Sequence, residues 1–185
     1  ALAEYLATPA GAAWQKRVAD DRGRYVAALA RGLIVRAGGD LYAYDVASPR
    51  WYRLTRTGGH VIAALRAGAH LAYVTRRHGE LGIGAIDLER GRATHANPAG
   101  GVGELTVVAA GDRFWIGHGG VRFELALDGK RLPAAARAPK GPSLVVTPGG
   151  AAHVSRLPVP SISADWDDQA LASAIRIGTT SRVVS

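Results

Sequence analysis

The stretch that decides the fold is Val61-Ile-Ala-Ala-Leu-Arg-Ala-Gly-Ala-His-Leu-Ala-Tyr-Val74, which resembles the earlier stretch Tyr25-Val-Ala-Ala-Leu-Ala-Arg-Gly-Leu-Ile-Val35. Each stretch leads into a strand-like run that ends in an apolar or aromatic residue followed by aspartate, and a third unit ends in the same step. These aspartates lie 42 and 41 residues apart, at Asp45, Asp87 and Asp128. A period of about 41 residues is typical of propeller blades, small four-stranded sheets that bury their faces by stacking on their neighbours.

The chain from residue 24 onward has the pattern of an all-β protein. Short apolar runs are interrupted by Gly, Pro or Asp at intervals of about 6 to 10 residues, and several runs alternate apolar and polar residues. The repeated aspartate is expected to cap the turn that follows its strand by accepting backbone hydrogen bonds. The strands predicted are Tyr25–Ala30, Leu33–Arg36, Asp40–Val46, Trp51–Thr55, His60–Arg66, Leu71–Arg76, Leu81–Leu88, Leu105–Ala110, Phe114–Gly117, Val121–Leu127, Leu144–Thr147 and Ala152–Arg156.

Residues 1–23 have a different pattern. Thr8 fits a helix N-cap and Pro9 the first helical position, and good helix formers follow. We therefore predict a short N-terminal helical segment within residues 1–23. Trp14 and Val18 share a stripe at four-residue spacing, which favours docking of this helix onto the rest of the domain.

The first two units resemble a known repeat family. The stretch Leu41-Tyr-Ala-Tyr-Asp-Val-Ala-Ser-Pro-Arg-Trp-Tyr-Arg-Leu-Thr-Arg-Thr-Gly-Gly59, followed by Leu71-Ala-Tyr-Val-Thr75, looks like the repeat of TolB-type, WD-repeat-like β-propellers. Ser163-Ala-Asp-Trp-Asp-Asp-Gln-Ala-Leu-Ala172 is similar to the Trp-Ser-Pro-Asp-Gly hairpin of that family, although Asp-Asp-Gln replaces Ser-Pro-Asp-Gly. The resemblance covers residues 24–178 and implies a circular array of blades used mainly for protein binding, often in the bacterial periplasm. Similar blades also precede hydrolase domains of the prolyl-oligopeptidase kind.

The expected architecture is a β-propeller, or a propeller fragment, of about four four-stranded blades behind the N-terminal helical segment. The helical segment is placed at residues 1–23 and the propeller at residues 24–185. Rings usually have roughly 4 to 8 blades, and the chain supplies three full units and part of a fourth. Because the chain also begins with alanine, a fragment or a processed product is favoured. The expected blades are residues 24–58, 59–101, 102–141 and 142–185.

The charge balance is strongly basic, with 23 Lys+Arg against 15 Asp+Glu and a formal net charge of +8. Arginine supplies 20 of the 23 basic residues, which fits a GC-rich bacterial source as well as selection for anion binding. The basic residues are spread along the chain apart from two short runs, Arg50-Trp-Tyr-Arg-Leu-Thr-Arg56 and Arg76-Arg-His78. This distribution disfavours a nucleic-acid partner. The basic surface favours an acidic protein or an anionic membrane face.

Several classes of chemistry are excluded by missing motifs. Cysteine is absent, which removes disulfides, thiol catalysis and cysteine zinc sites. Neither the Gly-x-Ser-x-Gly elbow of serine hydrolases nor a phosphate-binding loop occurs. No window approaches the ~18 consecutive apolar residues of a membrane-spanning helix. We expect no cofactor, and the sequence favours a role other than catalysis.

The candidate site residues are aromatic, basic or acidic. Arginine and aromatic side chains dominate interface hot spots, which makes Arg50, Trp51, Tyr52, Arg53 and Trp115 the candidates for partner binding; packing between blades is the alternative. The one dense acidic cluster is a calcium candidate, with a solvated hairpin tip as the alternative. Its members are Asp165, Asp167 and Asp168.

Two function classes follow from these observations. The first is a non-catalytic propeller scaffold or binding module that engages a partner protein in the bacterial cell envelope, with a periplasmic or extracellular location. The second is the non-catalytic propeller part of a larger, prolyl-oligopeptidase-like hydrolase. A propeller enzyme with a metal in its central channel is a third possibility.

Overall fold

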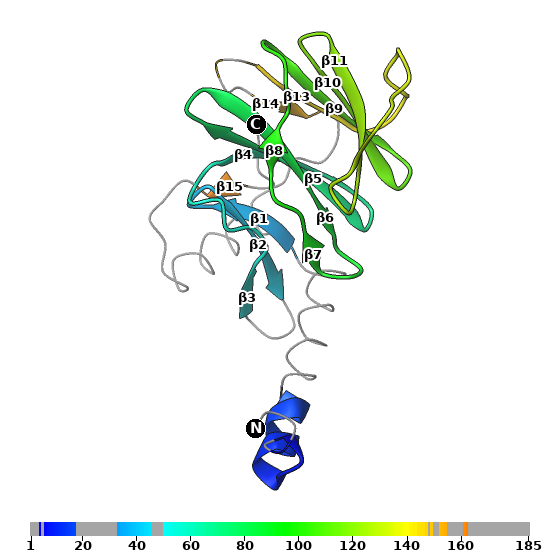
Figure 1. The fold of residues 1–185 in the computed structure, drawn as a ribbon. Coiled ribbons are helices and arrows are strands. Elements are labelled where there is room, and N and C mark those ends of the chain that lie inside the picture. The colour runs from blue at the N-terminus through cyan, green and yellow to red at the C-terminus, as the bar shows by residue number, and fades with distance from the viewer. Residues whose placement is uncertain are drawn as a thin grey trace.

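The computed structural model describes residues 4, 6–17, 33–45, 50–147, 149, 152–154 and 161–162. Within these residues the protein is mostly β-structure, as predicted, in three sheets that follow one another along the chain (Figure 1). Neighbouring strands are antiparallel except for one short parallel pair. The all-β prediction is confirmed for this part of the chain.

The three sheets are numbered here in chain order. The first has the order β15-β1-β2-β3 and contains β1 (Leu33–Ala37), β2 (Asp40–Asp45), β3 (Arg50–Arg53) and β15 (Ser161–Ile162). The second has the order β4-β5-β6-β7, with β8 also paired to β6, and contains β4 (Val61–Ala67), β5 (His70–Arg77), β6 (Glu80–Asp87), β7 (Arg92–Ala93) and β8 (Asn97–Pro98). The third has the order β12-β11-β10-β9-β13-β14 and contains β9 (Leu105–Ala110), β10 (Arg113–His118), β11 (Val121–Ala126), β12 (Arg131–Leu132), β13 (Ser143–Val146) and β14 (Ala152–Val154).

The sequence repeat corresponds to a structural repeat, because a two-residue hairpin turn occurs at the same place in each sheet. The turns are Gly38-Gly39, His78-Gly79 and Gly119-Gly120, spaced 40 and 41 residues apart. Both residues of every turn have positive φ, between 52° and 86°. Such turns match the right-handed twist of the paired strands. Positive φ favours glycine at all six positions, and glycine occupies five of them; the exception is His78.

Replacing His78 by asparagine is expected to raise the free energy of unfolding by roughly 0.5 kcal/mol. His78 has a φ of 52°, and Asn-Gly is the dipeptide that this turn type prefers. Urea unfolding of the variant measures the gain. His95→Asn is the matched control because positive φ among the described non-glycine residues is confined to His78; an equal gain in the control would contradict the turn explanation.

The aspartate caps predicted from the repeat are present in the second and third sheets. The Asp87 carboxylate accepts a hydrogen bond from the Arg90 backbone N–H at 3.0 Å. Asp128 accepts one from the Lys130 N–H, also at 3.0 Å. These bonds fix the turns that lead into β7 and β12.

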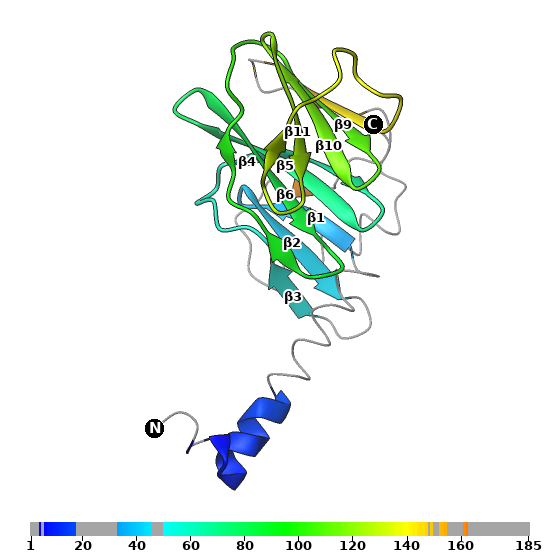
Figure 2. The ribbon, with the colours of Figure 1, turned by 45° about the vertical axis from the view of Figure 1, so that its right-hand side comes forward.

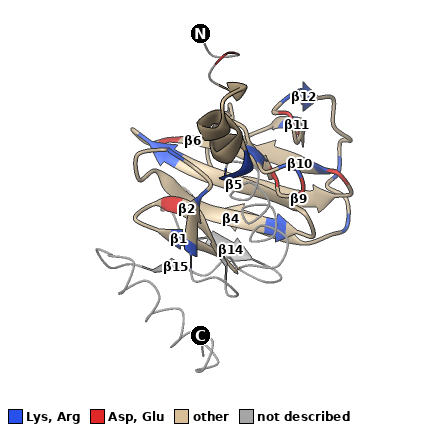
Figure 3. Cartoon of the chain, turned by 90° about the horizontal axis from the view of Figure 1, so that it is seen from below, with Lys and Arg blue, Asp and Glu red and all other residues tan. Residues whose placement is uncertain are grey.

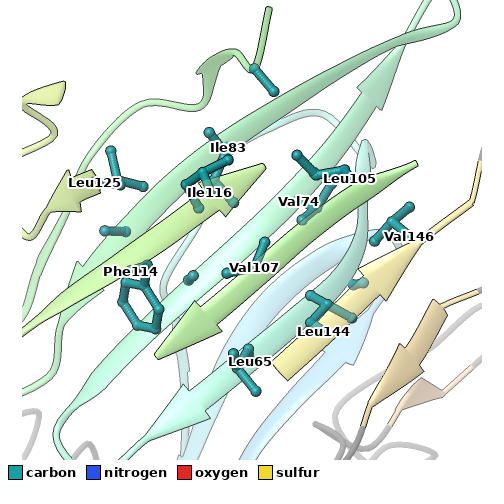
Figure 4. Close-up of a cluster of buried hydrophobic side chains, with 14 of the residues drawn as sticks. Leu65, Val74, Ile83, Leu105, Val107, Phe114, Ile116, Leu125, Leu144 and Val146 are labelled. Atoms are coloured by element: carbon teal, nitrogen blue, oxygen red, sulfur yellow. The ribbon is translucent and has the colours of Figure 1, made fainter. Parts of the chain in front are cut away.

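Most of the hydrophobic core lies between the second and third sheets. Figure 4 shows side chains from both sheets meeting in one layer. Leu65, Val74 and Ile83 come from the second sheet, and Leu105, Phe114 and Ile116 face them from the third. All six are at most 1% exposed, and burying a side chain of this size contributes roughly 1.5 to 3 kcal/mol.

The second sheet is buried on both faces. Along β5, Leu71 and Tyr73 belong to the core shared with the first sheet, whereas Ala72 and Val74 belong to the core shared with the third. Because side chains alternate between the faces of a strand, one central strand contributes to both cores. The sheets therefore stack face to face, as blades do, although closure into a ring is not part of the described structure (Figure 2).

The ends of the chain pair differently from the expected units. β13, expected to open the fourth blade, lies in the third sheet between β9 and β14. β15 pairs with β1 in parallel, on the side of β1 where the repeat places the strand predicted at residues 25–30. That predicted strand and most of residues 142–185 after β13 lie outside the described residues, so the fourth blade stays a prediction.

The N-terminal helix is present, but its predicted docking is not observed for Trp14. Residues 9–17 are helical, and the Thr8 hydroxyl caps them by accepting a hydrogen bond from the Gly11 N–H at 3.1 Å. Trp14 is 44% exposed, and the helical residues stand apart from the sheets in Figures 1 and 2. Val18 lies outside the described residues. Four-residue spacing indicates that two side chains lie on the same face of a helix. It does not indicate whether another part of the protein packs against that face.

Candidate functional site

A buried carboxylate organises the junction between the first two sheets. Asp40, at the start of β2, is 2% exposed. Its Oδ1 accepts hydrogen bonds from the Thr55 hydroxyl (2.6 Å), the Thr57 hydroxyl (2.9 Å) and the Thr57 backbone N–H (2.8 Å). Its Oδ2 accepts one from the Arg53 guanidinium at 2.6 Å. These four bonds hold the loop that connects β3 to β4 against the first sheet.

The hydrogen bonds decide the ionisation of Asp40. Burial by itself raises the pKa of the Asp40 carboxyl, but the bonds from Thr55, Thr57 and Arg53 together lower that pKa below its usual value near 3.8. A carboxylate that accepts several hydrogen bonds keeps its charge because each donor favours the ionised form. Asp40 is therefore ionised at neutral pH and balances the charge of Arg53.

A pocket of about 490 Å³ opens between this loop and the second sheet. The first sheet and its connecting loop supply Arg53 to Thr57 and His60. β5 supplies Tyr73, Thr75 and Arg77, and the end of β7 with the segment after it supplies residues 93–96. Its volume lies within the range of small-ligand sites. The lining contains three arginines and two histidines but no carboxylate: Arg53, Arg56, Arg77, His60 and His95.

The pocket forms where the two basic runs of the sequence meet. The Arg76 N–H donates a hydrogen bond to the His60 carbonyl at 2.9 Å, and the Val61 N–H donates one to the Gly39 carbonyl at 2.8 Å. These bonds bring the end of β5 beside the connecting loop, so that Arg56 and Arg77 line one pocket. Within the described part of the chain, neither Arg56 nor Arg77 forms an ion pair.

Tyr73 forms a rigid part of the pocket wall. It is 2% exposed, and its hydroxyl donates a hydrogen bond to the Thr94 carbonyl. Burial, with a smaller contribution from the charge of Asp40, raises the pKa of Tyr73 to about 12. Gly84 lies against the ring, where a Cβ atom would approach Tyr73 Cζ to 2.5 Å. Tyr73 therefore stays protonated and anchors the segment after β7.

Two further hollows continue from the pocket across the second sheet toward the third. A hollow of about 270 Å³ shares Thr75, Arg77 and Ala96 with the pocket. A third, of about 350 Å³, shares Glu80, Leu81 and Pro98 with the second and reaches the loop at Gly100–Gly103. We call the three together the groove.

The candidate binding residues predicted on β3 divide between packing and the groove. The Trp51 ring lies 4.4 Å from the Tyr44 ring, measured between centroids. Trp51 and Tyr52 are half-buried, whereas Arg50 is exposed at the start of the strand. Arg53 lines the pocket, although its guanidinium is held by Asp40 and by the Thr55 carbonyl at 2.9 Å. Of the four candidate residues on β3, Arg53 lines the pocket and the other three do not.

Trp115 has the contacts of a packing residue. It lies on β10 in the third sheet and is 7% exposed. Its indole N–H donates a hydrogen bond to the Ala135 carbonyl at 3.0 Å. Its ring covers Gly117, where a Cβ atom would approach Trp115 Cη2 to 2.5 Å. These contacts agree with the alternative that Trp115 packs within the fold rather than binding a partner.

Replacing Trp115 by phenylalanine is expected to lower the free energy of unfolding by about 1 to 2 kcal/mol, because the smaller ring leaves part of the buried volume empty and the hydrogen bond from the indole to the Ala135 carbonyl is lost. Chemical denaturation measures the change. Partner binding is expected to be unaffected under conditions in which the variant is folded. A variant with unchanged stability and weakened partner binding would instead identify Trp115 as a contact residue.

The calcium candidate stays a prediction, and the metal alternative receives no support from the described part of the chain. Asp165, Asp167 and Asp168 lie outside it. No group of three or more His, Asp or Glu side chains among the described residues could hold a metal ion. His118 is 5% exposed at the end of β10 and lines the far end of the groove.

Sequence reasoning missed most of the pocket. Arg56 and Arg77 each belong to a basic run that the sequence displays, but 20 residues separate them and nothing in the sequence pairs the two runs. His60 and His95 carry no spacing signal. Asp40 is the first residue of a strand, directly after the Gly38-Gly39 turn, and resembles an ordinary turn residue in sequence, so its four hydrogen bonds were not predicted.

Comparisons with known proteins found no relative of this chain: no protein-family model, no curated protein and no solved structure matches it significantly. None of the helices in the described residues has the length and apolarity needed to cross a membrane. Because no known protein matches the chain, the function of the site must be inferred from the chemistry of its own residues.

Proposed function

We propose that the chain is a non-catalytic binding module of the β-propeller type, TolB-like in its repeat, that engages a partner protein. The observation that carries the proposal is the pocket in which Arg56 and Arg77, both without ion-pair partners in the described structure, lie between two packed sheets. Arginines without an ion-pair partner are suited to binding, because their guanidinium groups are available to pair with a group of the partner.

Support for the non-catalytic part of the proposal comes from the hydrogen bonds of three of the five hydroxyl groups in the pocket lining. Thr55 and Thr57 direct their hydroxyls to Asp40, and Tyr73 directs its hydroxyl to Thr94. A nucleophilic hydroxyl needs an adjacent general base that takes its proton. Asp40, with its lowered pKa, is a poor base, and it is enclosed by the loop that it holds.

The location of the module is proposed from the family resemblance. A periplasmic or extracellular site in the cell envelope of a bacterium with a GC-rich genome fits both the TolB-like repeat and the arginine-rich composition. Fold analogy of this kind supplies a setting rather than a specific partner.

Native mass spectrometry of the protein, purified gently from its source, tests the proposal. We expect the 19.3 kDa chain to travel with a second polypeptide. Turnover of a substrate by the isolated chain would overturn the proposal. A catalytic domain in the same polypeptide would establish the hydrolase alternative.

A further inference from the structure

The pocket has an excess of positive charge that the described chain does not neutralise. Asp40 balances Arg53 across a 2.6 Å ion pair. Arg56 and Arg77 remain, both exposed and without a carboxylate in the pocket lining. Arginine binds carboxylates through paired, charge-assisted hydrogen bonds. The pocket is thus complementary to a group with negative charge.

The rest of the groove has a different character. Beyond Arg77, the lining passes through Glu80 to Leu81 and Pro98. It then reaches Val102, which is 82% exposed and is the most exposed large hydrophobic side chain in the described part of the chain. The groove therefore runs from a cationic end to an apolar end, and a ligand that fills it needs both kinds of group.

A polypeptide segment satisfies this requirement better than a nucleic acid does. A nucleic-acid backbone carries a regular series of negative charges and needs a continuous basic track. Here the basic end is followed by the Glu80 carboxylate and then by apolar residues. Figure 3 shows Lys and Arg distributed over all three sheets, without a continuous track.

We propose that the groove binds an extended acidic segment of the partner protein. Carboxylates of the segment pair with Arg56 and Arg77, and apolar side chains a few residues away cover Val102. This inference rests on the proposed function, because it names the partner segment that the binding module recognises. It specifies where on the module the partner binds, and that the bound segment carries negative charge at one end and apolar side chains at the other.

Binding of defined peptides to the full chain tests the inference. The probe is the heptapeptide Gly-Glu-Glu-Ser-Leu-Val-Gly, blocked at both ends, together with the peptide of reversed sequence so that either chain direction is sampled. Calorimetry and backbone-amide chemical shifts report affinity and location. We expect at least one of the two peptides to bind, and its Glu-to-Gln analogue to bind at least about tenfold more weakly, because charge-assisted hydrogen bonds are lost. Shifts are expected at Thr57, Arg77 and Thr94.

A matched pair of variants separates the pocket from the overall charge of the protein. Arg56→Glu/Arg77→Glu is expected to weaken acidic peptide binding at least about tenfold and to favour a Glu-to-Lys analogue. Arg122→Glu/Arg137→Glu changes the net charge equally at exposed residues outside the groove and is expected to bind as the unmodified chain does. Equal weakening by both variants would overturn the inference.

Other ligands would give distinguishable results. Inorganic phosphate or a single-stranded oligonucleotide that binds more tightly than either peptide, and loses affinity in Arg56→Glu/Arg77→Glu, would overturn the assignment to an acidic segment. Self-association abolished by the same variant would assign the groove to a second copy of the chain. If the native partner co-purifies and the variant retains it, this inference fails while the proposed function stands; if no partner exists, the proposed function fails.

Discussion

Replacing Asp40 by asparagine is expected to lower the free energy of unfolding by about 3 kcal/mol. Oδ1 of Asp40 accepts three hydrogen bonds and Oδ2 accepts one from Arg53. An asparagine amide would oppose one of these donors with its own N–H groups, leaving buried polar groups without partners. Because the Arg53 side chain is 45% exposed, solvent screens the ion pair, and the threonine hydrogen bonds account for most of the loss.

The same carboxylate predicts a pH dependence of stability. The pKa of Asp40 is lower in the folded protein than its usual value near 3.8. The ionised carboxylate therefore stabilises the folded state fully above the unfolded pKa, and this stabilisation is lost as pH falls through the folded pKa. Urea unfolding between pH 7 and pH 2 is expected to show a loss below about pH 4 that Asp40→Asn lacks.

Asp112→Asn is the matched control, because the Asp112 side chain is 77% exposed. It is expected to change stability by less than about 0.5 kcal/mol. An Asp40→Asn variant as stable as the unmodified protein would show that the carboxylate does not hold the loop.

Replacing Gly39 by alanine is expected to cost about 3 kcal/mol or more, from backbone strain and overpacking combined. Gly39 has a φ of 69°, and a Cβ atom there would lie 2.1 Å from the Gly59 carbonyl oxygen. The position of a Cβ atom is fixed by the backbone, and the Gly59 carbonyl is itself a backbone group, so neither can rotate away. The substitution would push the β1–β2 turn from the connecting loop and break the bond from the Val61 N–H to the Gly39 carbonyl.

Gly79→Ala separates the cost of backbone strain from the cost of overpacking. Gly79 is the corresponding residue of the second hairpin, with a φ of 84°, but nothing lies within 4 Å of its added Cβ. We expect a loss of about 1 to 2 kcal/mol there, from the left-handed backbone alone. Thermal and urea unfolding of both variants measure the difference. Equal losses would show that the turn and the connecting loop are not in contact.

The strands were predictable because two local signals agree along the chain. Alternation in Val121–Ala126 defines one buried face, and positive-φ glycines at Gly119-Gly120 define where the hairpin turns. β7 and β12 were missed because two residues are too few to display alternation. They pair through backbone hydrogen bonds that depend on the preceding strand rather than on their own side chains.

The pocket was less predictable, because its residues come from separate segments. The bond between the Arg76 N–H and the His60 carbonyl that brings the segments together involves backbone groups, which every residue has. Asp40 has the same sequence context as many exposed turn residues, and its burial depends on Thr55 and Thr57 folding back over it. Local patterns contain no information about such long-range contacts.

The most direct test of the account is amide hydrogen exchange of the chain, free and bound to the partner polypeptide recovered with it. The account predicts that the partner slows exchange in the segments 54–60 and 93–103, which contain residues that line the groove, and leaves β12 of the third sheet unchanged. Slowed exchange confined to β12 or to helical residues 9–17, with the groove unaffected, would contradict it.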